Sequence, residues 1–460
     1  MERFVVDRLR ETLADRVLTA ADADYDGART TFNATVQRRP AVIVRARTDD
    51  DVIAAVVAAA DLDLAIAVRG GGHSVAGHAM ADGALVVDLR DRREVHVDPD
   101  RQLVRVDGGA LWEDVDAAAW AHHLAVVGGT FGDTGVGGLA LGGGIGWLSG
   151  AQGFTCDNLV RAEVVTAAGE KVIAAPASDG DGDPELLWAL RGGGGNFGVV
   201  TSFTFRAIDP GPILAGYIRY PFSAVKQVLR QVADVAATAP GALELTVVIG
   251  PAEGGTPGTD DELFVRVGVC WPGDPDGARE ILHPLAAALP ALDDDLRLME
   301  YPEVQAMSGT LPFGLRHYWK GHFLRALDES VIGGVVDAMT ARPSGRSVML
   351  FEAIRGAARL EPEGGTAFNQ RSATWNASAL AIWDDPAHDD AHVTWGRAAA
   401  ERLAVGSLSG AGYANYASFD ETIERVRLAF GSDTFARLAK VKARYDPGNR
   451  FRFNLNIAPR

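Results

Sequence analysis

The sequence predicts an α+β protein of two domains, and three observations lead to this fold class. The chain has 460 residues, more than one hydrophobic core usually organises. Many of its 53 glycines cluster at 70–72, 128–146 and 192–198, all within the first 207 residues. From residue 208 these clusters end, and strand patterns alternate with helical ones. That second pattern is typical of an antiparallel sheet with helices on one face.

Composition and charge exclude several classes of protein. A hydrophobic content of 47% supports globular cores, and a net charge of −17 without basic clusters argues against nucleic acid or an anionic membrane as a partner. Residues 1–17 mix charges at helical spacing, unlike a signal peptide. The two cysteines, Cys156 and Cys270, provide no disulfide framework. We therefore expect a cytoplasmic protein, and the sequence leaves its oligomeric state open.

The first elements form a β-α-β unit that ends in a glycine loop. Thr48 or Asp49 can cap its helix. Its second strand leads into Gly70–Gly72, whose exposed N–H groups can form a concavity suited to a diphosphate. The predicted ranges are a helix over 2–18, a strand over 41–44, a helix over 50–60, and strands over 64–68 and 84–89.

The remaining periodic segments follow the same division of the chain. His122 and His123 lie near the C-terminus of one predicted helix, but no further ligands at suitable spacing accompany them, so we expect no metal site. Strands are predicted over 94–97, 103–107, 199–208, 244–249, 264–270, 348–354 and 374–383. Helices are predicted within 108–124 and over 185–191, 222–238, 276–289, 327–341 and 387–404, followed by two amphipathic helices before residue 445.

Several strings give the chain a family resemblance. RGGGHS, residues 69–74, resembles the flavin-attachment loop of the FAD-linked oxidases, the berberine bridge enzyme-like branch of the vanillyl alcohol oxidase superfamily. YANY (413–416) and YDPGNRFRFNLNIAP (445–459) resemble the C-terminal signature of that family. The resemblance implies a p-cresol methylhydroxylase-type FAD-binding fold. It assigns 1–207 and 412–460 to the FAD-binding domain and 208–411 to the substrate-binding domain.

The resemblance also implies how FAD is held. His73 matches the residue that carries FAD through the flavin 8α-methyl group. Some members have a second anchor, a cysteine, where this chain has Phe131, so a single 8α-histidyl link is expected. Thr134 falls where oxidases tend to have a small residue that leaves room for oxygen. The other residues expected to bind the cofactor are Val68, Arg69, Gly70, Gly71, Gly72, Ser74, Gly77, His78, Asp133, Gly137, Gly138, Gly142, Gly144, Gly146, Val199, Val200, Asn415 and Asn454.

The implied chemistry is hydride transfer from an alcohol or amine C–H of a small molecule to the flavin, followed by reduction of dioxygen to hydrogen peroxide. Tyr413 and Tyr416 are expected to be catalytic, because a cationic neighbour can lower the pKa of a tyrosine until it accepts a proton. Relatives can carry a Glu or Gln five residues before the Trp that matches Trp383, where this chain has Ser378. The residues expected to contact substrate are His317, Lys320, Glu352, Asn376 and Ser378.

Two alternatives remain open at this point. One is a flavin dehydrogenase that uses an acceptor other than oxygen. The other is a flavin-dependent cyclase or a binding protein that performs no net oxidation. The substrate is open too, since relatives oxidise sugars, phenols, amines and polyketide alcohols.

Overall fold

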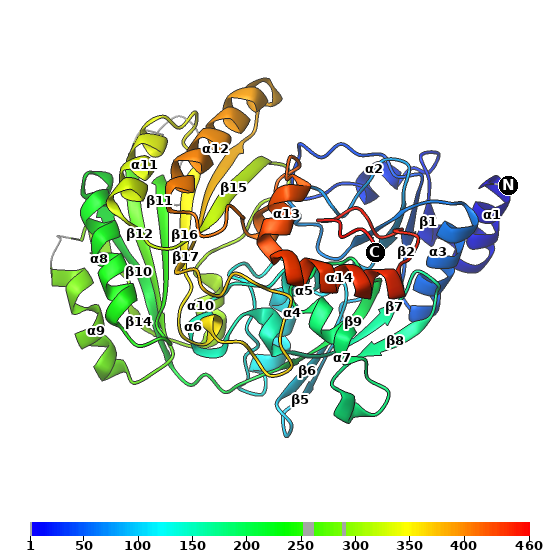
Figure 1. Cartoon of the computed structure of the whole chain (residues 1–460), viewed down its shortest axis with the longest axis horizontal. Helices are drawn as coiled ribbons and strands as arrows, with labels where there is room; N and C mark the ends of the chain where they lie inside the picture. The colour runs from blue at the N-terminus through cyan, green and yellow to red at the C-terminus, as the bar shows by residue number, and fades with distance from the viewer. Residues whose placement is uncertain (1, 252–261, 288–290) are drawn as a thin grey trace.

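The computed structural model describes residues 2–251, 262–287 and 291–460, and the strands within these ranges form three sheets (Figure 1). The first sheet has the order β1-β2-β4-β3, with β2, β4 and β3 parallel. The side chain of Thr48 caps the helix packed beside this sheet, as expected. The elements are α1 Glu2–Leu13, β1 Val17–Leu18, α2 Tyr25–Ala28, β2 Val42–Arg45, α3 Asp49–Asp61, β3 Ile66–Arg69 and β4 Leu85–Asp88.

The helix predicted over 2–18 is too long. After Leu13 the chain makes a short turn, and Val17 then pairs with Val44 as part of β1. Val17 is apolar and buried. An apolar residue at this position fits the buried face of a helix and equally fits the two-residue edge strand that is observed. Periodicity alone did not separate the two.

The second sheet is antiparallel, with the order β5-β6-β9-β7-β8. Leu186 and Leu190 pack with Phe203 of β9 in its core, and Phe435 and Leu438 join that core from the C-terminal end of the chain. Strands β7 and β8 were not predicted. The elements are β5 Val95–Asp98, β6 Leu103–Asp107, α4 Trp112–Trp120, α5 Val136–Leu141, α6 Ser149–Gln152, β7 Leu159–Val165, β8 Lys171–Ala174, α7 Pro184–Leu190, β9 Val199–Arg206, α13 Ile423–Phe430 and α14 Ser432–Tyr445.

The third sheet, here called the large sheet, is antiparallel and has the order β13-β10-β12-β11-β16-β17-β15, with β14 also paired to β10. Sequence patterns missed β10 and β15. Its strands are β10 Ile213–Pro221, β11 Glu244–Pro251, β12 Leu263–Trp271, β13 Asp293–Asp294, β14 Arg297–Met299, β15 Arg316–Leu324, β16 Val348–Ala353 and β17 Trp375–Trp383. Its helices are α8 Val225–Thr238, α9 Pro275–Ala287, α10 Tyr301–Ala306, α11 Glu329–Thr340 and α12 Asp389–Leu403.

Side chains alternate between the two faces of the large sheet. Leu245 and Val247 belong to the core beneath the helices, whereas Thr246 and Val248 line a cavity on the other face. Figure 1 shows α8, α9, α11 and α12 on the outer side of this sheet, away from the two smaller sheets. This arrangement confirms the predicted α+β class, with an antiparallel sheet covered by helices on one face.

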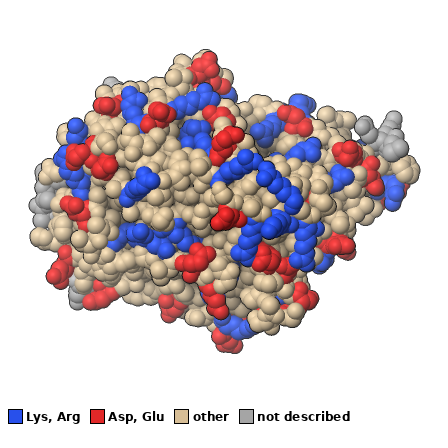
Figure 2. Space-filling view, in the orientation of Figure 1, with Lys and Arg blue, Asp and Glu red and all other residues tan. Residues whose placement is uncertain are grey.

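The C-terminal helices lie over the second sheet, and their outer surface is rich in basic side chains (Figure 2). Ion pairs connect Arg437 to Glu185 and Arg444 to Asp183. These contacts join the end of the chain to the segment around α7. Among the described residues, no helix is both long enough and apolar enough to cross a membrane.

Candidate functional site: a cavity between the glycine loops and the large sheet

A cavity of about 740 Å³ is lined on one side by the glycine-rich loops and on the other by the uncovered face of the large sheet. Its volume lies within the range of roughly 300–1,000 Å³ that is usual for small-molecule sites. The loop after β3, the loops around α5 and after α7, and the last residues of the chain all contribute. The cavity therefore brings together segments from the beginning, middle and end of the sequence.

Two of the glycine loops touch each other backbone to backbone. A Cβ atom added to Gly71 would lie 2.5 Å from the nitrogen of Gly135, and one added to Gly135 would lie 2.4 Å from the nitrogen of Gly71. Only glycine fits at either position. The contact fixes the loop after β3 against the start of α5, so that both present backbone to the same cavity.

His73 follows the first loop and lines the cavity, with its side chain 8% exposed. Burial lowers the pKa of His73 to about 4, so the imidazole is neutral at pH 7. Among the described residues neither ring nitrogen has a hydrogen-bond partner, and the Asp133 carboxylate is 4.0 Å from Nε2. The ring stacks on Phe32 and meets Phe313 edge-on. A neutral imidazole with free nitrogens can act as a nucleophile.

Most of the residues expected to bind the cofactor line this cavity together with His73. The hydroxyl of Thr134 donates a hydrogen bond of 2.6 Å to the carbonyl of Phe131, which closes a tight turn in the cavity wall. Burial lowers the pKa of His78 to about 4. The full set is Val68, Gly70, Gly71, Gly72, Ser74, His78, Phe131, Thr134, Gly137, Gly138, Gly142, Val200, Asn415 and Asn454.

Six expected cofactor residues lie outside the lining: Arg69, Gly77, Asp133, Gly144, Gly146 and Val199. The guanidinium of Arg69 donates instead to two carbonyls at the end of α2. Val199 points into a hydrophobic core, because alternation along β9 turns it away from the side on which Val200 lies. The N–H of Gly144 donates to Tyr413 Oη at 2.8 Å. Their contact with the cofactor therefore stays a prediction, and the contacts described for Arg69, Val199 and Gly144 are with the surrounding protein.

Glu352 stands in the opposite wall, on β16, and is 3% exposed. Tyr416 Oη donates a hydrogen bond of 3.0 Å to Oε1, and Asn376 Nδ2 donates one of 2.7 Å to Oε2. Burial raises the pKa of Glu352 to about 7, against the opposite effect of these two donors. The carboxyl therefore changes charge near neutral pH, as a general base requires.

The expectation that a cationic neighbour lowers the pKa of Tyr413 or Tyr416 is wrong. Burial raises the pKa of both phenols, and the nearby Glu352 carboxylate adds to the rise. Tyr413 Oη accepts hydrogen bonds from the N–H of Gly144 and from Asn415 Nδ2, at 2.8 and 2.9 Å. Tyr413 thus holds the glycine turn, and Tyr416 serves Glu352 as a hydrogen-bond donor.

Four of the expected substrate contacts do not line the cavity: His317, Lys320, Asn376 and Ser378. Lys320 pairs with Asp420 at 3.0 Å, because alternation along β15 turns it to the helix-covered face. His317 lies on the cavity side of β15 but is buried against Phe32. Asn376 and Ser378 share one face of β17, as expected, but Asn376 is bound to the Glu352 carboxyl and Ser378 packs against Gly321.

Sequence reasoning missed the apolar wall that faces the glycine loops. Its members are Trp319, Val348, Leu350, Leu380 and Ile382. In β16 the residues facing the cavity alternate with Met349 and Phe351, which belong to the core. All these residues are apolar, so the pattern reveals a strand without telling which face meets the cavity. Glu352, two places beyond Leu350, was the signal that could have fixed the face.

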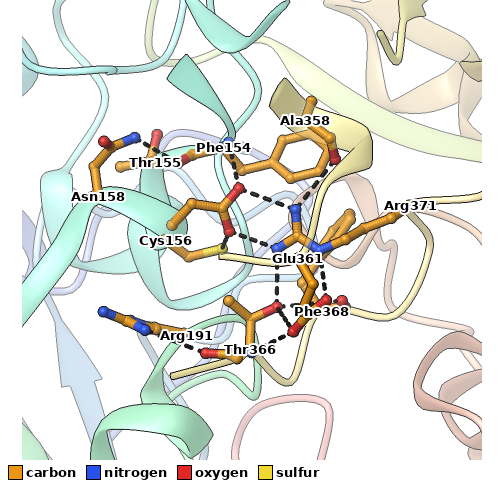
Figure 3. A network of polar contacts seen from close by, with 12 residues as sticks. Phe154, Thr155, Cys156, Asn158, Arg191, Ala358, Glu361, Thr366, Phe368 and Arg371 are labelled. Atoms are coloured by element: carbon orange, nitrogen blue, oxygen red, sulfur yellow. Dashed lines mark hydrogen bonds and ion pairs between the residues drawn. The ribbon is translucent and has the colours of Figure 1, made fainter. Parts of the chain in front are cut away.

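A buried ion pair behind the glycine loops joins the loop that precedes β17 to the segment that follows α6 (Figure 3). Arg371 donates to Asp157 Oδ2 at 3.0 Å. Its guanidinium carbon also lies 5.4 Å from the ring centroid of Phe154 and 5.8 Å from that of Phe368. Phe368 in turn leaves no space for a side chain at Gly143. The ion pair therefore holds the aromatic support of the glycine turn.

The residues around the cavity fit FAD. The glycine loops offer backbone N–H groups to a diphosphate, as glycine-rich nests do. The buried nitrogens of His73 have no partner among the described residues and are free to form a bond. Asn454 Oδ1 is likewise buried without a partner there, at the edge of the same cavity. The wall of the large sheet is apolar and suits the flat part of the cofactor or its substrate.

Comparison with known proteins supports this fit. One family model, described as an FAD binding domain, matches residues 40–174, and another, described as berberine and berberine like, matches 412–458. The (R)-6-hydroxynicotine oxidase of Paenarthrobacter nicotinovorans is 32% identical over 97% of each chain. The crystal structure of 6-hydroxy-D-nicotine oxidase from Arthrobacter nicotinovorans has a TM-score of 0.86 at 29% identity, covering 97% of this chain and 98% of the other. Xylooligosaccharide oxidase from Myceliophthora thermophila shares the fold, with a TM-score of 0.86 at 22% identity and 99% of each chain covered.

Proposed function

Because the chain belongs to the berberine bridge enzyme-like family of FAD-linked oxidoreductases, we propose that it oxidises a small-molecule alcohol or amine with FAD attached to His73. Dioxygen is the final electron acceptor, and hydrogen peroxide is the second product. The relatives named as oxidases, of 6-hydroxynicotine and of xylooligosaccharide, support this direction of the reaction.

One observation carries the proposal. Glu352, a carboxyl whose pKa lies at about 7, stands in the wall of the same cavity that contains the neutral imidazole of His73. A site that oxidises an alcohol or amine must accept a proton from O–H or N–H while the carbon loses a hydride. The position of Glu352 in the cavity wall and its raised pKa support the first task for this residue. His73 and the glycine loops provide for the cofactor that performs the second.

The bound flavin supplies a two-electron acceptor for the hydride that leaves the substrate carbon. Glu352 accepts the proton when it is ionised. Tyr416 and Asn376 fix its two oxygens, so that the carboxyl keeps one orientation. Burial of Glu352, which is 3% exposed, keeps the pKa of its carboxyl high.

Other residues of the cavity account for binding of the cofactor. His73 would hold FAD through a covalent bond, and the loops at Gly70–Gly72 and Gly137–Gly138 would hold its diphosphate. Phe131 cannot form a second bond, because its side chain has no nucleophilic atom. The link is therefore single.

Anaerobic mixing of the purified yellow enzyme with a panel of alcohols and amines tests the proposal. A substrate should bleach the flavin without air, and admission of air should restore the colour with release of hydrogen peroxide. A bleached flavin that air does not recolour would instead indicate a dehydrogenase. Conversion of a substrate without bleaching would indicate a reaction with no net oxidation.

A further inference from the structure

Phe32 lies in a stack of three rings that crosses from the glycine loop to the large sheet. Its ring centroid is 4.8 Å from that of His73, with an interplanar angle of 22°, and 4.2 Å from that of His317, with an angle of 26°. Phe32 is 0% exposed. Ring pairs at such distances attract each other beyond the effect of burying their area.

No hydrogen bond of normal geometry from the described part of the chain orients the His73 imidazole; the backbone of Asp133 is near enough to raise its pKa but does not meet that geometry. The orientation of a buried histidine is usually set by a partner on one ring nitrogen. Here neither nitrogen has one among the described residues, and the ring torsion of histidine is broad when nothing restrains it. Phe313 touches only the edge of the ring, with centroids 5.1 Å apart, and is itself 46% exposed. The flat contact with Phe32 is therefore the main restraint on the plane of the imidazole.

Phe32 is itself held firmly on both sides. Its N–H donates a hydrogen bond of 3.1 Å to the carbonyl of Gly72, next to His73. The neighbouring Asn33 donates from Nδ2 to the carbonyls of Val75 and His317, at 2.7 and 2.9 Å. Asn33 Oδ1 also accepts from the N–H of His317 at 2.9 Å. The ring of Phe32 is thus a fixed platform, joined to the loop that it supports.

We infer that Phe32 is a positioning residue for the bond between His73 and FAD. The inference rests on the proposed covalent link and deepens it. In that step a C–H bond of the flavin 8α-methyl group and the N–H bond of the imidazole break, and a C–N bond forms. The two electrons released reduce the flavin, and dioxygen then removes them, taking up the two protons as hydrogen peroxide. Because Phe32 stacks on the face of the imidazole, both ring nitrogens stay uncovered at the edge of the ring, and the plane of the ring is fixed.

The test compares Phe32→Leu, which removes the ring, with Phe32→His, which keeps a flat ring in a smaller volume. Phe205→Leu is the matched control, since Phe205 is also 0% exposed but belongs to the core of the second sheet. Full-length protein from riboflavin-starved cells is mixed with FAD. Total bound flavin and acid-stable flavin are then followed over time, so that the readout does not depend on activity.

Phe32→Leu should bind FAD and attach it about tenfold more slowly or worse, as misorientation of a reacting group predicts. Phe32→His and Phe205→Leu should attach it at nearly the wild-type rate. Attachment by Phe32→Leu as fast as by wild type overturns the inference, and so does Phe32→His as slow as Phe32→Leu. If Phe32→Leu binds no FAD, the attachment rates of Phe32→His and Phe205→Leu are compared. Equal rates support the inference, and slower attachment by Phe32→His overturns it. Wild-type protein without any acid-stable flavin would refute the covalent link itself, a result distinct from all of these.

Discussion

The hydroxyl of Tyr416 and the carboxyl of Glu352 are joined by a hydrogen bond of 3.0 Å, although 64 residues separate them in the chain. Glu352 comes from the middle of the large sheet, and Tyr416 comes from the segment that returns to the glycine loops. The pair therefore ties the wall that faces the substrate to the half of the molecule that binds the cofactor. It also turns a buried carboxyl toward the cavity in a single orientation.

Replacement of Glu352 by glutamine should slow reduction of the flavin by substrate by about 10²–10⁴-fold, the usual contribution of a general base. Glutamine keeps the shape and the hydrogen bond from Tyr416 but cannot accept the proton. Anaerobic stopped-flow absorbance measures the reduction step. Glu244→Gln is the matched control, because Glu244 is 2% exposed on the neighbouring strand and outside the cavity lining. Equal rates for the two variants would remove Glu352 from the mechanism.

The rate of flavin reduction should depend on the ionisation of Glu352. Its pKa is raised from 4.5 to about 7, and the base works when ionised, so the rate should rise as pH increases through 7 and then level off. The Glu352→Gln variant should lack this rise. A rise that persists in Glu352→Gln would assign the titration to another group.

The raised pKa of Glu352 affects the stability of the fold in the opposite direction, so that the free energy of unfolding falls as pH rises. The unfolded carboxyl ionises at lower pH than the folded one, so the stabilisation from Glu352 is complete below pH 4.5 and is lost as pH rises through about 7. Urea unfolding of wild type and Glu352→Gln across that window should show the difference between their free energies of unfolding falling with pH.

All acid-stable flavin should be found on the peptide that contains His73, and His73→Ala should retain FAD only without a covalent bond. Burial raises the pKa of the Cys156 and Cys270 thiols, so neither offers a thiolate as a second anchor. Mass analysis of peptides after digestion reads the site of attachment directly. A flavin adduct on either cysteine would contradict the single link.

Thr134→Leu should slow reoxidation of the reduced flavin by air, while reduction by substrate stays close to wild type. Thr134 lines the cavity, and a longer side chain there narrows the path for oxygen. Misplacement of a reacting partner can cost about a hundredfold. Rapid mixing separates the two half-reactions, and Thr134→Val serves as the control of similar size. Unchanged reoxidation in Thr134→Leu would show that this position does not control access of oxygen.

Removal of the Arg371 guanidinium should destabilise the protein by about 3–5 kcal/mol, because Arg371→Met leaves the Asp157 carboxylate buried without its partner. The double variant Arg371→Met, Asp157→Asn should recover much of the loss. Arg437→Met, which removes an exposed ion pair with Glu185, should cost only about 0–1 kcal/mol. Urea unfolding measures all three, and a double variant as unstable as Arg371→Met would show that the buried charge is not the cause.

The cofactor half of the site could be predicted from sequence, because its function resides in the backbone. Glycines at 71 and 135 are required by close contact of two loops, and that requirement is visible as glycine in the string itself. His73 was found in the same way. The side chains in the opposite wall of the cavity were harder to predict. Burial raises the pKa of Glu352 and Tyr416 fixes its orientation, and neither the burial nor a partner 64 residues away leaves a local signal.

Strands that were not recognised account for site residues that the sequence misplaced. Because β15 was not recognised, Lys320 was assigned to the cavity, whereas alternation along the strand places it beside Asp420. Phe32 belongs to no motif, and only the folded chain brings it against His73. A strand seen in the sequence tells which residues alternate. It does not tell which of the two faces will meet the cavity.

The last segment of the chain has a consequence for biosynthesis. The carbonyl of Arg450 accepts a hydrogen bond from the N–H of Ile66 in β3, and Asn415 and Asn454 line the cavity. A nascent chain that still lacks residues 412–460 has its glycine loops but neither of these asparagines nor Tyr416. Capture of the cofactor must therefore follow the folding of residues 412–460 onto the glycine loops, and products truncated before residue 412 should accumulate as colourless protein.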